Sequence, residues 1–373
     1  MASDVAIIAF ISGVLTSLSL LHTYRQKSVS DSTSGFSSLV GRTKLVYLRH
    51  LSDLLGCRIF GKAEFLNPGG SVKDRVAIKL VSEARKRGCD TVIEATSGST
   101  GISLALACKE AGLKLKIVMP DDVSEEKIKL IKVLGADVQL VRPVSIADPN
   151  HMCKIAEKFA QLNPNCFYTN QFENLVNFDA HYEGTACEIL QDLPEIDVFV
   201  ASAGTGATIA GVASKIKRLR TSSIQTILAD VQGSALATRV NTGVMFNSLD
   251  REGFRVKHPY DTITEGVGLN RLTENFRKGI KNIDHAVHIS DQEAVDMAHY
   301  LLQSEGLFLG SSSAVNVAGV VKAFKQGLIR PGSTVVTILC DTGMRHLSKF
   351  WSESYLKERG LLPRRISPLD FIA

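Results

Sequence analysis

Lys73 is the residue whose surroundings most favour chemistry. It lies in the stretch 67–75, where a turn of one Pro and two Gly residues leads into Ser71, a good helix N-cap residue. A helix-like spacing of apolar residues follows and places Lys73 in the first helical turn. Because a helix N-terminus is partially positive, it favours the neutral amine, which can form a Schiff base with an aldehyde cofactor. An ordinary surface lysine is the alternative.

Two further segments each follow a strand-like run and open a helix-like run. In the first, 94–101, hydroxyl groups and free backbone N–H groups at a helix N-terminus form an anion site that suits a carboxylate. In the second, 203–211, Gly204 and Gly206 let the backbone approach a phosphate closely. Ile209 stands where a dinucleotide-binding fingerprint needs a third Gly, and no Walker A lysine follows. A plain strand-to-helix turn is the alternative for the first segment.

The elements that must position these loops alternate from residue 40 onward. Apolar runs typical of buried parallel strands lie at 91–95, 115–119, 138–141, 198–201, 224–231 and 335–340. Helix-like patterns lie between them, at 103–111, 124–134, 209–219 and 291–304, the last with Ser290 and Asp291 as its cap. This alternation predicts an α/β fold with a mostly parallel sheet.

Composition argues against several classes of protein. The net charge of +5 is spread along the chain, which indicates a solvated surface and no nucleic-acid footprint. The seven cysteines are odd in number and scattered, without a Cys-x-x-Cys. This pattern disfavours a disulfide framework or a zinc site and favours a reducing compartment. The histidines have no metal-ligand spacing, so we expect no metal.

The N-terminal residues differ from the rest of the chain. Residues 5–21 carry no charge and, at about 1.5 Å per residue, are just long enough to cross a lipid bilayer. Asp4 precedes this run and basic residues follow it, which places the downstream chain in the cytosol. A cleaved signal peptide is the competing interpretation, but no basic region precedes the run. We therefore expect a transmembrane anchor at 1–24 and a flexible linker at 25–40.

The stretch 67–75 (NPGGSVKDR) resembles the pyridoxal-phosphate lysine motif of the cysteine synthase and cystathionine β-synthase family, which are fold-type II enzymes. The segments 96–101 and 204–208 are similar to the family's carboxylate and phosphate loops. Further matches follow in family order at 41–46, 119–120, 132–136, 170–174, 181, 265–268, 305–314 and 340–343. Val76, where serine and threonine dehydratases have Gly, favours the cysteine synthase side.

The resemblance implies a site for pyridoxal 5′-phosphate with Lys73 as the Schiff-base and catalytic residue. It implies that the cofactor-binding residues are Lys73, Ser99, Gly204, Thr205, Gly206, Ala207, Thr208 and Ser312. Ser312 is matched to the serine that bonds the pyridine nitrogen. The implied substrate-binding residues are Thr96, Ser97, Thr100 and Gln171. The resemblance also implies a two-lobed fold, with a larger lobe at 41–66 and 176–365 and a smaller lobe at 67–175.

Two cofactor-loop residues depart from the family pattern. Ser99 stands where the family has an Asn that contacts the 3′-oxygen of the cofactor, and a Ser hydroxyl is shorter. Ala207 stands where the family has Gly, although it keeps the backbone N–H. Lys44 and Ala314 differ as well.

The sequence therefore predicts a membrane-anchored β-replacement enzyme, a cysteine synthase that converts O-acetylserine and sulfide to cysteine and acetate. We expect a homodimer held in the mitochondrial outer membrane through residues 5–21 and facing the cytosol. The departures from the family pattern motivate a second hypothesis, a cofactor-binding scaffold of the same fold with weak or lost turnover. A third, a nicotinamide dehydrogenase with Asp230 as ribose ligand, is disfavoured by the missing third Gly.

Overall fold

The computed structural model describes residues 35–219, 224–246, 262–364 and 366–372. The chain divides into two units, 1–39 and 40–373. In the first, the described part is a short helix, α2 (Gly35–Leu39), at the end of the predicted linker. The predicted anchor at 5–21 lies outside the described residues. Within the described ranges, no helix has the length and apolar character needed to span a bilayer.

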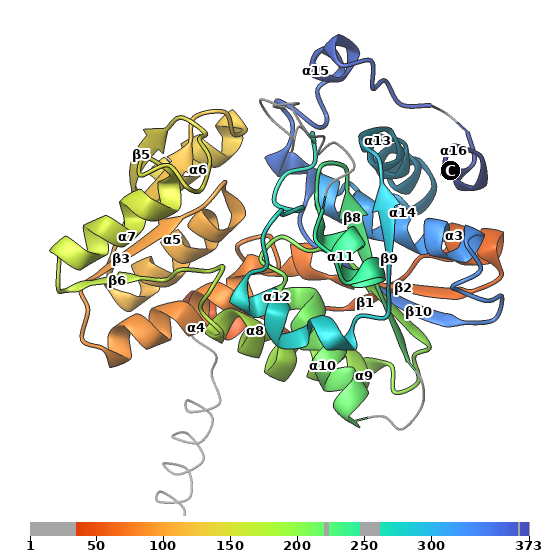
Figure 1. Cartoon of the computed structure of the whole chain (residues 1–373), viewed down its shortest axis with the longest axis horizontal. Helices are drawn as coiled ribbons and strands as arrows, with labels where there is room; N and C mark the ends of the chain where they lie inside the picture. Colours follow the sequence, from red (N-terminus) through yellow and green to blue (C-terminus); the bar gives the residue numbers. More distant parts are fainter. Residues whose placement is uncertain (1–34, 220–223, 247–261, 365, 373) are drawn as a thin grey trace, which may run out of the picture. The chain divides into compact units, whose positions relative to one another are not determined.

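The second unit contains a six-stranded sheet in the order β1-β2-β10-β7-β8-β9 (Figure 1). The first pair, β1 and β2, is antiparallel, and every other neighbouring pair is parallel. The strands in this order are β1 (Leu45–Tyr47), β2 (Arg58–Ala63), β10 (Thr334–Leu339), β7 (Val198–Ala201), β8 (Gln225–Val231) and β9 (His285–Ile289).

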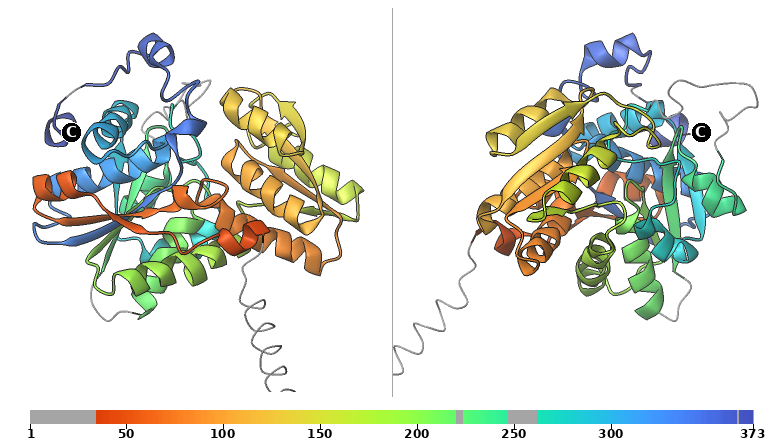
Figure 2. Two further views of the ribbon diagram at one scale, coloured as in Figure 1. Left: turned by 180° about the vertical axis from the view of Figure 1, so that it is seen from behind. Right: turned by 60° about the vertical axis from the view of Figure 1, so that its left-hand side comes forward.

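A second sheet has four parallel strands in the order β5-β4-β3-β6. The strands are β5 (Asp137–Val141), β4 (Lys114–Pro120), β3 (Thr91–Ala95) and β6 (Cys166–Tyr168). Figure 2 shows both sheets with their helices from two further sides. The predicted α/β fold with mostly parallel sheets is confirmed.

The helices cover the sheets. They are α3 (Arg49–Leu55), α4 (Lys73–Lys86), α5 (Ser99–Ala111), α6 (Glu125–Val133), α7 (Met152–Leu162), α8 (Val176–Ala180), α9 (Ala186–Asp192), α10 (Ala207–Leu219), α11 (Leu236–Thr242), α12 (Glu274–Gly279), α13 (Asp291–Tyr300), α14 (Ser311–Lys325), α15 (Glu353–Glu358) and α16 (Pro368–Phe371). Shorter helical turns are η1 (Glu64–Leu66), η2 (His181–Thr185), η3 (Ile280–Asn282), η4 (Leu301–Glu305) and η5 (Gly343–Arg345). The central helix α14 is buried along most of its length and packs against β7, β8, β9 and β10.

Predicted and observed elements agree closely where hydrophobic runs are long. The strands at 91–95 and 198–201 have the predicted bounds, and the other predicted strands differ by one residue at one end or at both ends. Four strands, β1, β2, β6 and β9, were not predicted, because three of them are short or half-exposed and β2 contains charged residues.

Two helices begin earlier than the apolar spacing indicates. α5 starts at Ser99 and α10 at Ala207, so Thr100 and Thr208 lie in first helical turns. The apolar pattern could not show this, because the residues that begin these two helices are small or polar. The predicted cap of α13 is present as a capping box of Ser290 and Glu293.

Ser71 is not the N-cap of α4, which corrects the expectation. Val72 occupies that position with helical backbone angles and makes no side-chain cap. The Ser71 hydroxyl instead accepts a hydrogen bond from the backbone N–H of Lys73 over 3.3 Å. Lys73 is the first residue of the helix, so its predicted place in the first helical turn is confirmed.

Candidate active site

A cavity of about 270 Å³ brings the predicted site residues together. Its walls come from the N-terminal ends of α4, α5, α10 and α14, which belong to segments far apart in the sequence. Every predicted site residue except Ala207 lines this cavity. Ala207 is fully buried, and its N–H donates to the Thr205 hydroxyl over 3.4 Å.

Lys73 is partly buried at the cavity wall. Burial lowers the pKa of Lys73 below its ordinary value, while the neighbouring Cys340 and Asp341 oppose that shift. The expected bias toward a neutral amine is therefore present, and its largest cause is loss of solvent. A neutral amine at this position can act as a nucleophile or take up a proton.

The loop before α5 forms the first anion-binding wall. Thr96, Ser97, Ser99 and Thr100 line the cavity at the N-terminus of a 13-residue helix. Gly98 has a φ of 146°, and a Cβ there would lie 2.4 Å from Cδ of Lys127, so only glycine fits. This geometry turns hydroxyl groups and helix N–H groups toward the same space, which suits a carboxylate.

The loop before α10 forms the second anion-binding wall. Gly204, Thr205, Gly206 and Thr208 line the cavity. A Cβ on Gly204 would lie 2.1 Å from the carbonyl oxygen of Gly266, so this close approach of two backbones requires glycine. The free N–H groups of the α10 N-terminus suit a phosphate.

His181 supports this second wall from behind. Its Nε2 is hydrogen-bonded with the Thr208 hydroxyl over 3.2 Å and its Nδ1 with the Thr185 hydroxyl over 3.0 Å. Burial, together with nearby Lys73 and Arg75, lowers the pKa of His181 well below its ordinary value. A neutral imidazole therefore holds Thr208 in place.

The remaining wall comes from the start of α14 and the end of β10. Ser312 lines it, beside Asp341, whose carboxylate lies 3.0 Å from His346 Nε2. Burial would raise the pKa of Asp341, but His346, with help from Lys127, lowers it to about 2. Asp341 is therefore an anion at neutral pH.

Sequence reasoning missed several cavity residues. Lys127 of α6 is 4% exposed and forms an ion pair with Glu265. Glu265 belongs to the segment 265–268, which was noted only for its similarity to the family. Met152, Asn316 and His346 also line the cavity. Each is an isolated residue of its type in its own segment, so no local spacing could have indicated it.

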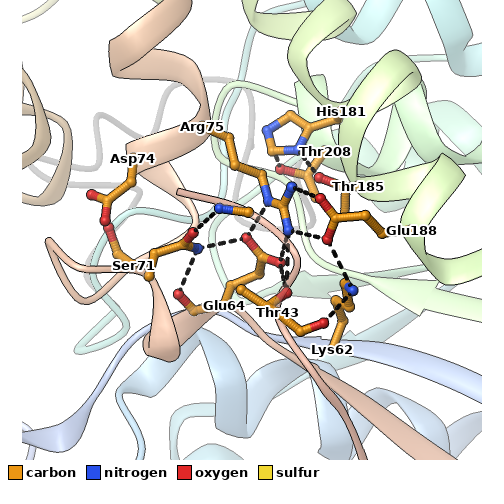
Figure 3. Close-up of polar contacts among 12 residues, drawn as sticks. Thr43, Lys62, Glu64, Ser71, Asp74, Arg75, His181, Thr185, Glu188 and Thr208 are labelled. Atoms are coloured by element: carbon orange, nitrogen blue, oxygen red, sulfur yellow. Dashed lines mark hydrogen bonds and ion pairs between the residues drawn. The ribbon is translucent and has the colours of Figure 1, made fainter. Parts of the chain in front are cut away.

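A buried ionic cluster fixes the helix that carries Lys73 (Figure 3). Arg75 Nε donates to Glu64 Oε2 over 2.6 Å, and its Nη1 and Nη2 donate to the carboxylate of Glu188 over 2.6 and 2.7 Å. Arg75 Nη2 also contacts the Thr43 hydroxyl, and the buried Lys62 amine lies 3.0 Å from Glu188. The cluster joins the first turn of α4 to η1, α9 and β2, and so sets the position of Lys73.

This arrangement fits pyridoxal phosphate. A lysine with a lowered pKa faces a phosphate-type cradle in which a Cβ at Gly204 would clash, and a hydroxyl, Ser312, lies on a separate wall. A second anion site beside the lysine suits the carboxylate of an amino acid. These features define the class of enzymes that use this cofactor on amino acids.

Comparison with known proteins gives the family. The model of the family "Pyridoxal-phosphate dependent enzyme" matches residues 36–341, and the chain belongs to this family of pyridoxal-phosphate-dependent enzymes. The chain is 42% identical to "Cysteine synthase 2" of Schizosaccharomyces pombe, over 95% of this chain and 93% of the other. It is 40% identical to a Saccharomyces cerevisiae protein provisionally named a mitochondrial cysteine synthase, over 94% and 92% of the two chains. A solved O-acetylserine-dependent cystathionine β-synthase of Helicobacter pylori matches with a TM-score of 0.72 and 32% identity, over 85% of this chain and 97% of that one.

Proposed function

We propose that this protein is a cysteine synthase that replaces the acetoxy group of O-acetylserine with sulfide. The observation that carries the proposal is that Lys73 and two helix N-termini, one suited to a carboxylate and one to a phosphate, line the same cavity. The similarity to cysteine synthases over nearly the whole chain supports the same reaction.

In this proposal each wall has one task. Thr96, Ser97, Thr100 and Gln171 hold the substrate carboxylate. The loop 204–208 would hold the cofactor phosphate, Ser312 would bond the pyridine nitrogen, and Ser99 would contribute to the cofactor-binding wall; all except Ala207 line the cavity. When bound, pyridoxal phosphate supplies an electron-withdrawing ring that stabilises negative charge at the substrate α-carbon.

Lys73 moves the proton in both halves of the reaction. Its Nζ takes the proton from the α-carbon, and acetate leaves from the β-carbon with its bonding electron pair. Sulfide then bonds to the β-carbon, and Lys73 returns a proton to the α-carbon. The neutral Ser312 hydroxyl makes the ring less electron-withdrawing than a carboxylate partner would, which favours replacement at the β-carbon.

The test uses the purified protein loaded with pyridoxal phosphate. We expect sulfide-dependent consumption of O-acetylserine with formation of one cysteine and one acetate for each substrate molecule consumed. A holoenzyme with normal cofactor absorption and no turnover with any serine-type donor would instead support the scaffold with lost turnover. Light scattering would test the proposed homodimer in the same preparation.

The Ser99→Asn variant should raise β-replacement activity. Asn is longer than Ser and would restore the contact to the 3′-oxygen of the cofactor that the family makes at this position. The measurement is kcat for cysteine formation together with the absorption maximum of the bound cofactor. Equal or lower activity would mean that the surrounding loop has adapted to Ser99, and our interpretation of this departure would be wrong.

We also propose that residues 5–21 anchor the enzyme in the mitochondrial outer membrane, with the cavity on the cytosolic side. The uncharged run and the basic residues after it support this topology. After carbonate extraction of isolated mitochondria the protein should stay in the pellet, and added protease should digest it with the outer membrane intact. Protection from protease together with release into the supernatant would contradict the anchor. A variant without residues 1–24 should still bind cofactor, because the cofactor loops lie downstream of residue 41.

A further inference from the structure

Glu94 is a buried carboxylate behind the cavity wall for which the mechanism above has no task. It is the penultimate residue of β3, has none of its surface exposed, and lies between the buried Ile93 and Ala95. A carboxylate without solvent is costly unless hydrogen bonds or a cation compensate. Within the ranges that the structure describes, no Lys, Arg or His side chain forms an ion pair with Glu94, so hydrogen bonds must stabilise it.

The partners of Glu94 direct donors at both of its oxygens. Oε1 accepts from the N–H of Ala95 over 2.8 Å, and Oε2 accepts from the N–H of Gln171 over 3.1 Å and from the Thr169 hydroxyl. The side-chain Nε2 of Gln171 lies 3.4 Å from Oε1. The two backbone groups and the amide nitrogen can only donate, so this environment suits the ionised carboxylate.

These contacts decide how Gln171 is oriented. Its Nε2 faces two acceptors, Glu94 Oε1 and the carbonyl oxygen of Ala95 at 3.1 Å. Its Oε1 must therefore face the other way, where it accepts a hydrogen bond from the Thr100 hydroxyl over 2.7 Å. Gln171 and Thr100 both line the cavity, so a continuous line of contacts leads from the buried carboxylate to the cavity wall.

We propose that Glu94 is a positioning residue for the carboxylate of the amino-acid substrate. The inference rests on the proposed function. The ionised Glu94 fixes the backbone and side chain of Gln171, and Gln171 fixes the Thr100 hydroxyl at the first turn of α5. Gln171 thereby holds the Thr100 hydroxyl within the wall that is proposed to bind the substrate carboxylate.

The same contacts make the binding of the substrate carboxylate dependent on pH. Burial raises the pKa of Glu94 to about 7, although the bonds from Thr169 and Gln171 oppose this shift. A proton on Glu94 can be accommodated, because the Thr169 hydroxyl can accept it as a hydrogen bond and donate its own hydrogen to the Ile93 carbonyl, 3.2 Å away. The ionised form is thus present above pH 7 and is lost as the pH falls below it, so amino-acid affinity should weaken from pH 8 to pH 6.

The other titratable groups that face Glu94 keep their charge state in this range. They are Tyr168 of β6 and Cys153 of α7. Burial raises the pKa of Cys153 to about 11 and raises that of Tyr168 still further. Both side chains are therefore neutral between pH 6 and 8.

The test is the Glu94→Gln variant, studied as holoenzyme. The probe is L-serine, whose dissociation constant is measured from the absorption change of the bound cofactor, with KM for O-acetylserine measured alongside. We expect L-serine affinity about tenfold weaker at pH 8, as for the loss of one charge-assisted hydrogen bond. Between pH 8 and pH 6 the affinity of the variant should fall less than that of the wild-type enzyme, because only the proton that the L-serine ammonium group must lose still contributes. The kcat at saturating O-acetylserine and the KM for sulfide should change little, because Glu94 touches no reacting group.

Two further variants separate positioning from a general structural effect. Thr169→Val removes a bond to the ionised form, so the pH at which affinity falls should move upward. Glu173→Gln, two residues from Gln171, removes a carboxylate that bonds Arg271 and the N–H of Glu274, and it should keep the wild-type pH profile. If Glu94→Gln does not fold, the shift in Thr169→Val decides.

Two results would count against the inference in different ways. A Glu94→Gln enzyme with the wild-type dissociation constant and pH profile would overturn the role of Glu94 and leave the proposed function intact. A wild-type holoenzyme whose absorption responds to neither L-serine nor O-acetylserine, and which does not consume O-acetylserine, would overturn the proposed function and the role of Glu94 with it.

Discussion

The Lys73→Ala variant should lose about three orders of magnitude or more in kcat, in line with removal of a group that both bonds the cofactor and transfers a proton. It should still bind pyridoxal phosphate, because the loop 204–208 is untouched. The measurements are cysteine formation at saturating substrates and the amount of cofactor retained after dialysis.

A matched control and a chemical label make this prediction specific. Lys79→Ala removes a lysine of the same helix that is 35% exposed and pairs with Glu183, and it should keep its activity. Borohydride reduction of the wild-type holoenzyme followed by peptide mapping should place the pyridoxyl group on Lys73. A label on another lysine would refute the assignment.

Replacing Arg75 by Met should destabilise the fold by about 3–5 kcal/mol. The cause is that Glu64, which has no exposed surface, and Glu188 lose the guanidinium that holds them together. Met fills a similar volume and leaves little cavity. The loss of stability therefore comes mainly from the uncompensated charge of the two carboxylates. The measurement is the midpoint of urea-induced unfolding at pH 8, compared at equal cofactor loading.

The control for Arg75 lies at the other end of the same helix. Arg87 is 58% exposed and forms an ion pair with Glu83 one turn away, so Arg87→Met should cost less than about 1 kcal/mol. Adding Glu64→Gln to Arg75→Met should recover part of the lost stability, because it removes the buried unpaired charge. A cost below that of Arg87→Met would show that the ionic cluster does not hold α4 in place.

Local chain geometry indicated where anions could bind, and the resemblance to a known family assigned each loop its expected role. The loops 67–75, 94–101 and 203–211 each place particular residue types at a helix N-terminus, and free N–H groups there bind anions in any fold. The buried strand β7 was predicted for a similar reason, since its uninterrupted apolar run identifies a strand covered on both faces. The strands β1 and β6 have only three residues each, too few for such a run, and were missed.

The tertiary structure decided what surrounds these loops. The pKa of Lys73 is lowered mainly by burial, which depends on how residues far apart in the chain close over the cavity. Lys127 and His346 reach the cavity wall from segments that carry no recognisable motif. In the sequence, Glu94 is only a polar residue within a mostly apolar run. Its contact with Gln171 arises because β6 pairs in parallel with β3. The residues that follow β6 therefore pass the end of β3, where the N–H of Gln171 donates to Glu94. Spacing along the chain determines helix ends and strands, whereas burial and contacts between distant residues are set only by packing.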